Sequence, residues 1–183
     1  SGSTVTLANS TISGNAVKGS YAPYAWHEGG GLYVSSGTLT LNNSIVARNW
    51  AAGAAQDVYG SFSGQGNLIG VDPGFARDPS AGVDGVWGTA DDDPGDLHLR
   101  VDGFAVNWGR NDLAVDGAGN PLTMDGDGNP RVVDGLVDAG AHEYQGTMPA
   151  GREIPSTEVT SLTDAIDPYD GLITLREAIL YTA

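Results

Sequence analysis

Residues 30–49 contain three short apolar runs separated by two polar turns. The runs span residues 32–34, 38–41 and 44–47, and the turns are Ser35-Ser36-Gly37 and Asn42-Asn43. In the second run, Leu39 and Leu41 alternate with threonines, which is the period-two pattern of a half-buried strand. Each run is too short for a hairpin arm in an ordinary β-sandwich. Three short strands joined by tight turns therefore predict one coil of a three-sided parallel β-helix.

Residues 4–15 repeat this pattern upstream at a constant offset of 34 residues. Asn9 corresponds to Asn43 and Asn15 to Asn49, and the apolar positions coincide as well. A constant offset is typical of a solenoid. Asparagine suits such turns because its amide can bond the asparagine above or below, and because its backbone tolerates the left-handed conformation. The alternative is two similar strands of a β-sandwich.

The predicted fold is an all-β, right-handed, three-sided parallel β-helix with an acidic, loop-rich C-terminal region and one short C-terminal helix. A third coil is expected at residues 57–62 and 66–70. The side chains expected to point inward are Val5, Leu7, Ile12, Leu32, Val34, Leu39, Leu41, Ile45 or Val46, Val58, Phe62, Leu68 and Ile69.

The composition divides the chain into four parts. Residues 1–71 hold the coils, and residues 72–144 form the acidic region that completes or caps the solenoid. In that region 15 carboxylates face four arginines and no lysine. Residues 145–157, with Pro149, Gly151 and Pro155, are typical of a linker. Residues 158–183 are expected to form a strand at 158–162 and a helix that begins after Thr174, with Glu177 placed to complete a capping box.

The net charge limits the partners of the chain. With 23 acidic and 8 basic residues among 183, the formal charge is −15, which disfavours nucleic acid and anionic membranes. No apolar run is long enough to span a bilayer. The absence of cysteine excludes a disulfide framework and a thiolate metal site. Without an initial Met or a signal peptide, the chain is expected to be a mature or excised piece of a protein outside a microbial cell.

The acidic region contains two candidate calcium sites. The first gathers five carboxylates within thirteen residues, namely Asp84, Asp91, Asp92, Asp93 and Asp96. Oxygen-rich loops with glycines suit Ca²⁺, although a solvated acidic loop is the alternative. The second is Asp125-Gly126-Asp127-Gly128-Asn129, which has the spacing of an EF-hand loop but lacks its glycine and its bidentate glutamate. Asp116, Asn120 and Asp134 could supply further ligands.

A second kind of ligand site is suggested by the aromatic loop at residues 16–29. Tyr21, Tyr24 and Trp26 offer flat apolar faces with polar tips, which could stack on a polysaccharide. The alternative is a flap packed over its own coil.

The residues give little support for catalysis. Lys18 is the single lysine and lies in a loop, and residues 4–15 and 38–49 contain no carboxylate. His27, His98 and His142 are isolated in the sequence and lack metal-ligand spacing. We therefore expect no catalytic residues, with a polysaccharide lyase or hydrolase as the alternative function.

Two segments carry a resemblance to a known family. Residues 159–164 and Leu172-Ile173-Thr174-Leu175-Arg176-Glu177-Ala178-Ile179 resemble the CSLREA-type segment that opens many bacterial secreted parallel β-helix proteins, with Ile173-Thr174 in place of Cys-Ser. Residues 131–144, ending in Gly140-Ala141-His142-Glu143-Tyr144, resemble the choice-of-anchor-like region that closes them. The resemblance implies a tandem-repeat surface protein, in a family that also includes adhesin-like and lyase-like members.

The order of these segments leads to an assembly hypothesis. In the family the LREA-type segment opens the β-helix, whereas in this chain it comes last, so the chain is expected to be one period of a tandem array. Its apolar residues Val159, Leu162, Leu175 and Ile179 could cap the first coil of the same chain or that of the next copy. The second arrangement is favoured and predicts head-to-tail filaments stabilised by calcium.

Overall fold

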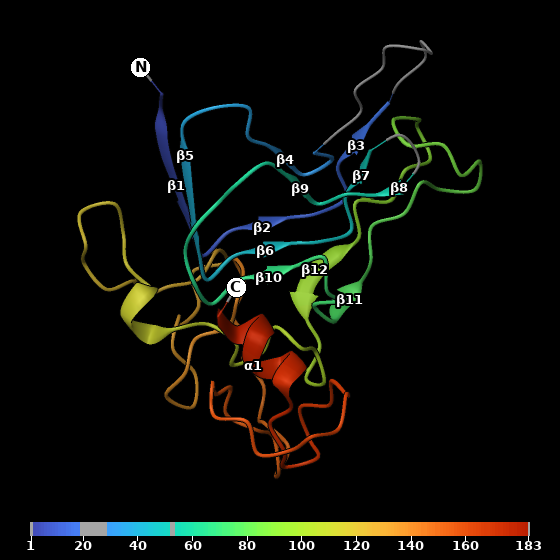
Figure 1. The fold of residues 1–183 in the computed structure, drawn as a ribbon. Helices are drawn as coiled ribbons and strands as arrows, with labels where there is room; N and C mark the ends of the chain where they lie inside the picture. The colour runs from blue at the N-terminus through green and yellow to red at the C-terminus, as the bar shows by residue number, and fades with distance from the viewer. Residues whose placement is uncertain (1, 19–28, 52–53, 183) are drawn as a thin grey trace.

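The computed structural model describes residues 2–18, 29–51 and 54–182. Short strands in its first half lie in layers, with the acidic loops beside them and the C-terminal segment beneath (Figure 1). The elements in the first half are β1 (Thr4–Ala8), β2 (Thr11–Ile12), β3 (Ala16–Val17), β4 (Leu32–Tyr33), β5 (Thr38–Asn42), β6 (Ile45–Val46), β7 (Trp50–Ala51), β8 (Ala54–Ala55), β9 (Val58–Tyr59) and β10 (Leu68–Ile69). They are followed by β11 (Phe75–Arg77), β12 (Asp96–Leu99), η1 (Asn111–Leu113) and α1 (Leu175–Thr182).

The repeat seen in the sequence sets the pairing of the first two layers. β1 pairs with β5, β2 with β6 and β3 with β7, all in parallel. The register matches Thr4 with Thr38, Thr11 with Ile45 and Ala16 with Trp50, so each pair keeps the 34-residue offset. The predicted parallel stacking of residues 4–15 on 38–49 is therefore confirmed.

The asparagines at the corners behave as expected from their chemistry. Asn9 and Asn43 both adopt a left-handed φ of 48°, which asparagine tolerates better than most residues. The Asn43 Nδ2 donates to Asn9 Oδ1 at 3.3 Å, and Asn15 Nδ2 donates to Asn49 Oδ1 at 3.0 Å. Each corner thus turns the chain and links the two layers by a side-chain amide.

The third layer is less regular. β10 pairs with β6 through Leu68 and Ile45, whereas β9 pairs with β4 through Val58 and Leu32. The sequence separations of these pairs differ from each other and from the first repeat, so the third layer does not continue a constant period.

The predicted right-handed three-sided parallel β-helix is wrong. The described strands form five separate sheets of two or three strands, and none of these sheets closes or continues as a solenoid. Two pairings are antiparallel, β7 with β8 and β11 with β12. The physical reason is that the repetition stops after residue 70, where Pro73 lacks the N–H for a ladder and the next strand, β11, pairs with β12 and not with the layers. Beyond β12, pairing within the described residues is limited to isolated bridges such as Val115–Pro121 and Ser161–Thr174.

Two apolar clusters lie in the layers. One contains Leu39, Leu41 and Val46, with Leu7, Ile12, Leu32, Val34, Val58, Phe62 and Ile69 packed against them. The other joins Ile45 and Leu68 to Phe75, Phe104, Val106 and Trp108 of the second half. These clusters confirm the predicted inward set except for Val5, which is 47% exposed because no further layer covers β1 among the described residues.

The C-terminal segment, residues 145–182, folds against the second half. Both predicted halves of the capping box form, since Glu177 N donates to Thr174 Oγ1 at 3.2 Å and Thr174 N donates to Glu177 Oε2 at 2.8 Å. Tyr181 of α1 packs edge-on against Trp108 at 5.3 Å between ring centroids. The predicted strand at 158–162 is reduced to the single bridge at Ser161.

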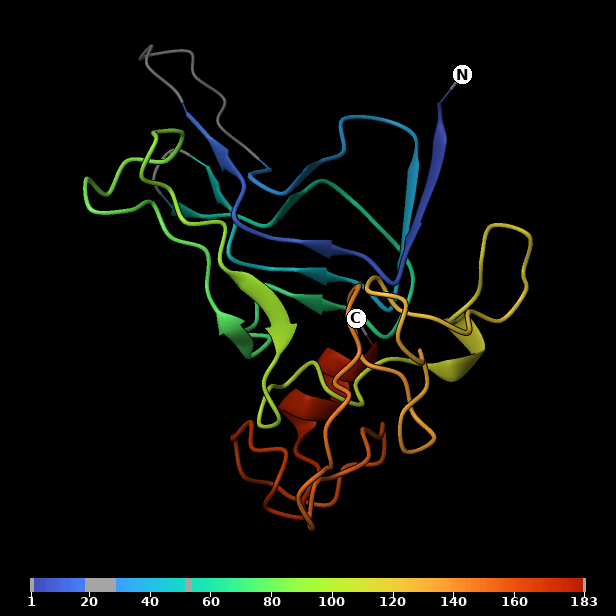
Figure 2. The ribbon, with the colours of Figure 1, turned by 180° about the vertical axis from the view of Figure 1, so that it is seen from behind.

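Figures 1 and 2 place β1 and this C-terminal segment on opposite sides of the β2–β6–β10 layer. Accordingly, the segment does not cover the first strand of its own chain. No described helix combines the length and hydropathy needed to cross a bilayer.

Candidate functional site

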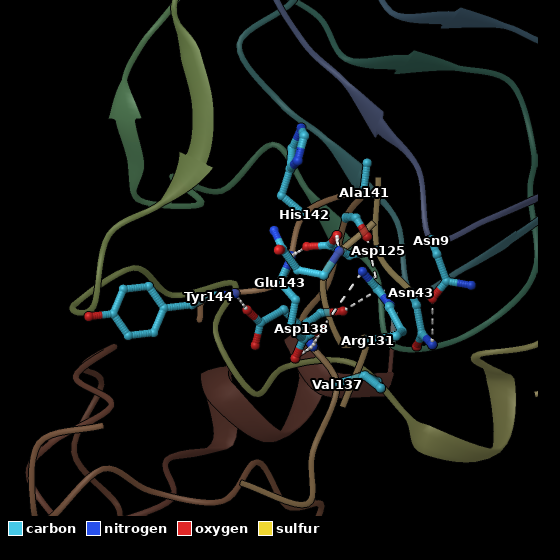
Figure 3. Close-up of polar contacts among 12 residues, drawn as sticks. Asn9, Asn43, Asp125, Arg131, Val137, Asp138, Ala141, His142, Glu143 and Tyr144 are labelled. Atoms are coloured by element: carbon cyan, nitrogen blue, oxygen red, sulfur yellow. Dashed lines mark hydrogen bonds and ion pairs between the residues drawn. The ribbon is translucent and has the colours of Figure 1, made fainter. Parts of the chain in front are cut away.

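A buried arginine lies where the two halves of the molecule meet (Figure 3). The Arg131 side chain is 1% exposed, and its Nη2 donates to the carbonyls of Asp138 and Gly140, both at 2.9 Å. The same atom donates to Asn9 Oδ1 at 3.0 Å. Arg131 therefore ties the closing segment 137–144 to the corner between β1 and β2.

Two buried carboxyls face this guanidinium. Glu143 Oε2 lies 3.6 Å from Arg131 Nη1, and both Glu143 oxygens accept the N–H of Asp138 at 3.1 Å. The Asp138 oxygens accept the backbone N–H groups of Asn107 and Tyr144, each at 2.6 Å. Asp138 thus holds residue 107 and residue 144 together through one side chain.

The burial of this pair changes its protonation. Burial raises the pKa of Asp138 to about 6, against the stabilising effect of its two N–H donors. Burial, and secondarily the Asp138 charge, raises the pKa of Glu143 to about 9. One guanidinium thus lies beside two buried carboxyls, and the carboxyl pair retains one proton near neutral pH.

Further contacts extend the network into the repeat. Asn43 Oδ1 accepts the N–H of Arg110 at 2.8 Å, while its Nδ2 donates to the Arg110 carbonyl at 2.9 Å. The Ala141 N–H donates to Thr11 Oγ1 at 2.9 Å. Residues 131–144 therefore connect the second half to the repeat, through Arg131 to Asn9 and through Ala141 to Thr11.

The predicted second calcium loop is a turn organised by Asp125. Its Oδ1 accepts the N–H groups of Asp127 and Asn129, at 3.0 and 2.9 Å. Its Oδ2 accepts the Glu143 N–H at 3.0 Å, so the turn is fixed to the closing segment. Asp116 caps its own turn in the same way through Asn120. Asp134, the last of the predicted ligands, adopts a left-handed φ of 53°.

The carboxylates of the first predicted calcium site are spread over separate turns. The Asp84 carboxylate accepts the N–H of Val86. Asp91 accepts the N–H groups of Val83 and Asp84. Asp92 accepts the N–H of Gly88. Asp93 pairs with Arg77 at 2.8 Å, which holds the pKa of the Asp93 carboxyl below its usual value. Asp96 contacts His98. Among the described residues, no three of these acids gather into a group that could share one ion.

A cluster that the sequence did not reveal joins His98, Asp127 and His142. Asp127 Oδ2 lies 2.8 Å from His98 Nε2 and 2.9 Å from His142 Nδ1. The two imidazole rings lie 4.5 Å apart between centroids. The residues come from β12, the 125–129 turn and the closing segment, so spacing along the chain gives no signal of the cluster. His98 and His142 are isolated in the sequence, as stated above, but lie side by side in the folded chain.

The two ends of the molecule expose apolar side chains. A hollow of about 230 Å³ opens beside β1, lined by Ser3, Val5, Leu7, Leu32, Tyr33, Val34, Ser35, Ser36, Thr38 and Leu39. At the other end, a groove of about 510 Å³ is lined by Leu162, Thr163, Asp164, Leu175, Arg176, Ile179 and Leu180. Of the predicted assembly residues, Leu162 is fully exposed, and Leu175, Ile179 and Val159 are 60%, 58% and 40% exposed.

The remaining predicted site lies outside the described residues, since Tyr21, Tyr24 and Trp26 fall in the segment 19–28. The stacking of a polysaccharide on these rings stays a prediction.

Comparison with known proteins gives no assignment: no protein-family model, curated protein or solved structure matches the chain.

Proposed function

We propose that the chain is a non-catalytic structural module that associates head to tail with copies of itself, in a repetitive array on or outside a microbial cell. The observation that carries the proposal is the uncharged, apolar hollow beside β1. In a chain with a formal charge of −15, all ten residues that line this hollow are neutral. Exposed apolar patches of this kind are typical of interaction sites.

The backbone of β1 supports the same interpretation. β1 is paired only with β5, so one edge of the strand has no partner within the described residues. An open strand edge presents unpaired N–H and C=O groups, which proteins normally cover. A partner that covers it has to bring both apolar side chains and backbone hydrogen-bonding groups.

The C-terminal segment of a second copy has these properties. Leu162, Leu175 and Ile179 project apolar surface around its groove. Next to Leu162, Ser161 makes one parallel bridge with Thr174, and the N–H groups of Thr160 and Ser161 donate to the Ile173 carbonyl. This ladder ends at Leu162, where a strand of a second copy could extend it. The charged pair at the groove, Asp164 with Arg176, is already neutralised internally.

The placement of the two surfaces determines the type of assembly. β1, which lines the hollow, and α1, which lines the groove, lie on opposite sides of the β2–β6–β10 layer (Figure 1), so a contact between unlike surfaces leaves one of each free and adds copies without closing. Repulsion between chains of charge −15 opposes this contact at low salt and is screened by added ions. We include calcium in the proposal because it would bind the exposed aspartates of residues 84–96 weakly and reduce that repulsion.

Sedimentation velocity tests the proposal. The chain is expected to form larger species as its concentration and the salt concentration rise. Leu162→Ser combined with Leu175→Ser should remain monomeric, whereas Val83→Ser, which removes an equally exposed apolar side chain from the acidic loop, should assemble like the original chain. A chain that stays monomeric at its highest soluble concentration in high salt would contradict the proposal.

A further inference from the structure

The ligand set of the His98, Asp127 and His142 cluster differs from that of the acidic loops. It combines two imidazoles with one carboxylate, and the three donor atoms lie within 4.8 Å of one another. Imidazole nitrogen suits zinc and other transition metals, whereas calcium takes oxygen ligands. We infer that these three side chains form a binding site for a divalent transition cation, of which Zn²⁺ is the representative.

The orientation of His98 fits a metal ligand. Its Nδ1 lies 2.5 Å from Asp96 Oδ1, and its Nε2 faces the cluster. Metal-binding histidines are commonly oriented by a carboxylate on the nitrogen that does not bind the ion. Asp96 precedes His98 by two residues on β12 and also accepts the His98 N–H at 3.2 Å, so backbone and side chain fix the ring together.

The other two ligands are held by the turn chemistry already described. Asp125 caps Asp127 with one oxygen and binds the Glu143 N–H with the other. The Gly126 N–H donates to the Ala141 carbonyl at 2.8 Å. The segments that carry Asp127 and His142 are therefore connected beside both ligands, and their separation does not depend on the metal.

The distances leave room for an ion after a small adjustment. In a tetrahedral zinc site with bonds of about 2.0–2.2 Å, neighbouring ligand atoms lie roughly 3.3–3.5 Å apart. The two hydrogen-bonded contacts to Asp127 Oδ2, at 2.8 and 2.9 Å, must open by about half an ångström. The His98 side chain is 56% exposed and that of Asp127 37%, so rotation of these side chains suffices.

Three protein ligands leave a fourth position of a tetrahedral site open to water. The bound ion would connect β12 to the 125–129 turn and to the closing segment. Metal binding at this cluster is independent of self-association, because neither end surface contains these residues.

Calorimetric titration of the full chain with ZnCl₂, after treatment with a chelator, tests the inference. The expected result is one Zn²⁺ per chain, a higher melting temperature with zinc, and no displacement by excess CaCl₂. Cobalt as a probe should give the visible absorption of a tetrahedral N/O site. His98→Ala, His142→Ala and Asp127→Asn should each weaken zinc binding by more than the roughly 10- to 100-fold expected for the orienting variant Asp96→Asn.

Two variants serve as matched controls. Asp116→Asn removes a carboxylate from a similarly capped turn without a neighbouring histidine, and His27→Ala removes the third histidine of the chain. Both should bind zinc as the original chain does. The inference is overturned if the chain binds no zinc, or if the three ligand variants, shown to be folded by circular dichroism, bind it unchanged.

Discussion

The two halves of the molecule use different kinds of buried polar residue. Among the described residues up to residue 70, the buried polar side chains are neutral, namely Asn43, Ser44, Asn49 and Asn67. In residues 72–182 they are mostly ionisable, namely Arg131, Asp138, Glu143 and Glu177, with Thr174 the neutral exception. In the first half, the repeated strands pair their backbone N–H and C=O groups with one another. Polar side chains therefore bind mainly the backbone and side-chain groups at the corners between strands. The second half lacks long ladders, and its carboxylates and one guanidinium bind main-chain groups instead.

This difference has an energetic consequence. A repeat spreads its stability over many similar contacts, each between nearest neighbours. A charged network concentrates stability in a few groups, because removing one charge leaves its partners buried and unpaired. Single substitutions should therefore have their largest effects in the second half and at the junction.

The substitution with the largest expected effect is Arg131→Met. It takes the nearest positive charge away from the buried Glu143 carboxyl and one of two from Asp138, and it removes the donor to three oxygens. We expect a loss of about 3–5 kcal/mol in the free energy of unfolding, measured by urea denaturation. Arg100→Met is the control, since Arg100 is exposed and forms a surface ion pair with Asp102, and should cost less than about 1 kcal/mol. If both variants lose the same free energy of unfolding, the buried network contributes no more to stability than a surface ion pair.

Asn43→Gly should have an intermediate effect, because it acts at the junction. Glycine keeps the left-handed φ of 48° without strain, so the substitution removes only the amide. The backbone N–H and C=O of Arg110 then lose their partner, which costs about 1–3 kcal/mol. Asn43→Ala should cost more, since it adds backbone strain. If both variants unfold like the original chain, the corner amide does not couple the halves.

The remaining effect concerns pH and should arise from the two buried carboxyls of the second half, Asp138 and Glu143. The pKa of Asp138 is raised from 3.8 to about 6, so the folded chain binds this proton more tightly than the unfolded chain. Stability from Asp138 is complete below its unfolded pKa and is lost as the pH rises through about 6. The melting temperature should be higher at about pH 5 than at about pH 7.5.

Asp138→Asn distinguishes this effect from the general charge of the chain. Asparagine does not titrate, so the variant should show a smaller difference between the two pH values. Its melting temperature should be lower at both, because one oxygen cannot accept the N–H groups of both Asn107 and Tyr144. The charged groups around Asp138 are Arg131, Arg152 and Glu143. The pKa of Glu143 is raised to about 9, so its stability is lost in the same direction over this range. If Asp138→Asn keeps the full difference between the two pH values, the pH dependence belongs to Glu143 and not to Asp138.

The sequence revealed the parts of the structure that depend on local or repeated patterns. The parallel register followed from apolar positions and asparagines at a constant offset, and the α1 cap followed from Thr174 and Glu177. The sequence did not predict the fold class correctly, because the predicted β-helix required the repeat of residues 4–15 and 38–49 to continue further along the chain. After residue 70 the described strands are paired antiparallel or not at all, and no pattern of period two or 34 marks that change.

The candidate sites were harder to predict because their partners are distant in the sequence. Arg131 binds a residue 122 positions away, and no local pattern distinguishes it from the exposed arginines. The acidic stretch suggested one shared ion, but in the structure each of these aspartates accepts a hydrogen bond from a backbone N–H group within eight residues of it. His98 and His142 meet because Asp125 and Gly126 bind the closing segment beside the turn that carries Asp127.

Cysteine cross-linking tests the head-to-tail contact most directly, because the chain contains no cysteine of its own. Val5→Cys places a thiol beside β1, and Leu175→Cys places one at the groove of the C-terminal segment. When the two variants are mixed and oxidised, mixed disulfide dimers should predominate, whereas Val83→Cys should not cross-link to Leu175→Cys. Dimers formed only between identical variants, or none at all, would contradict a contact between unlike ends.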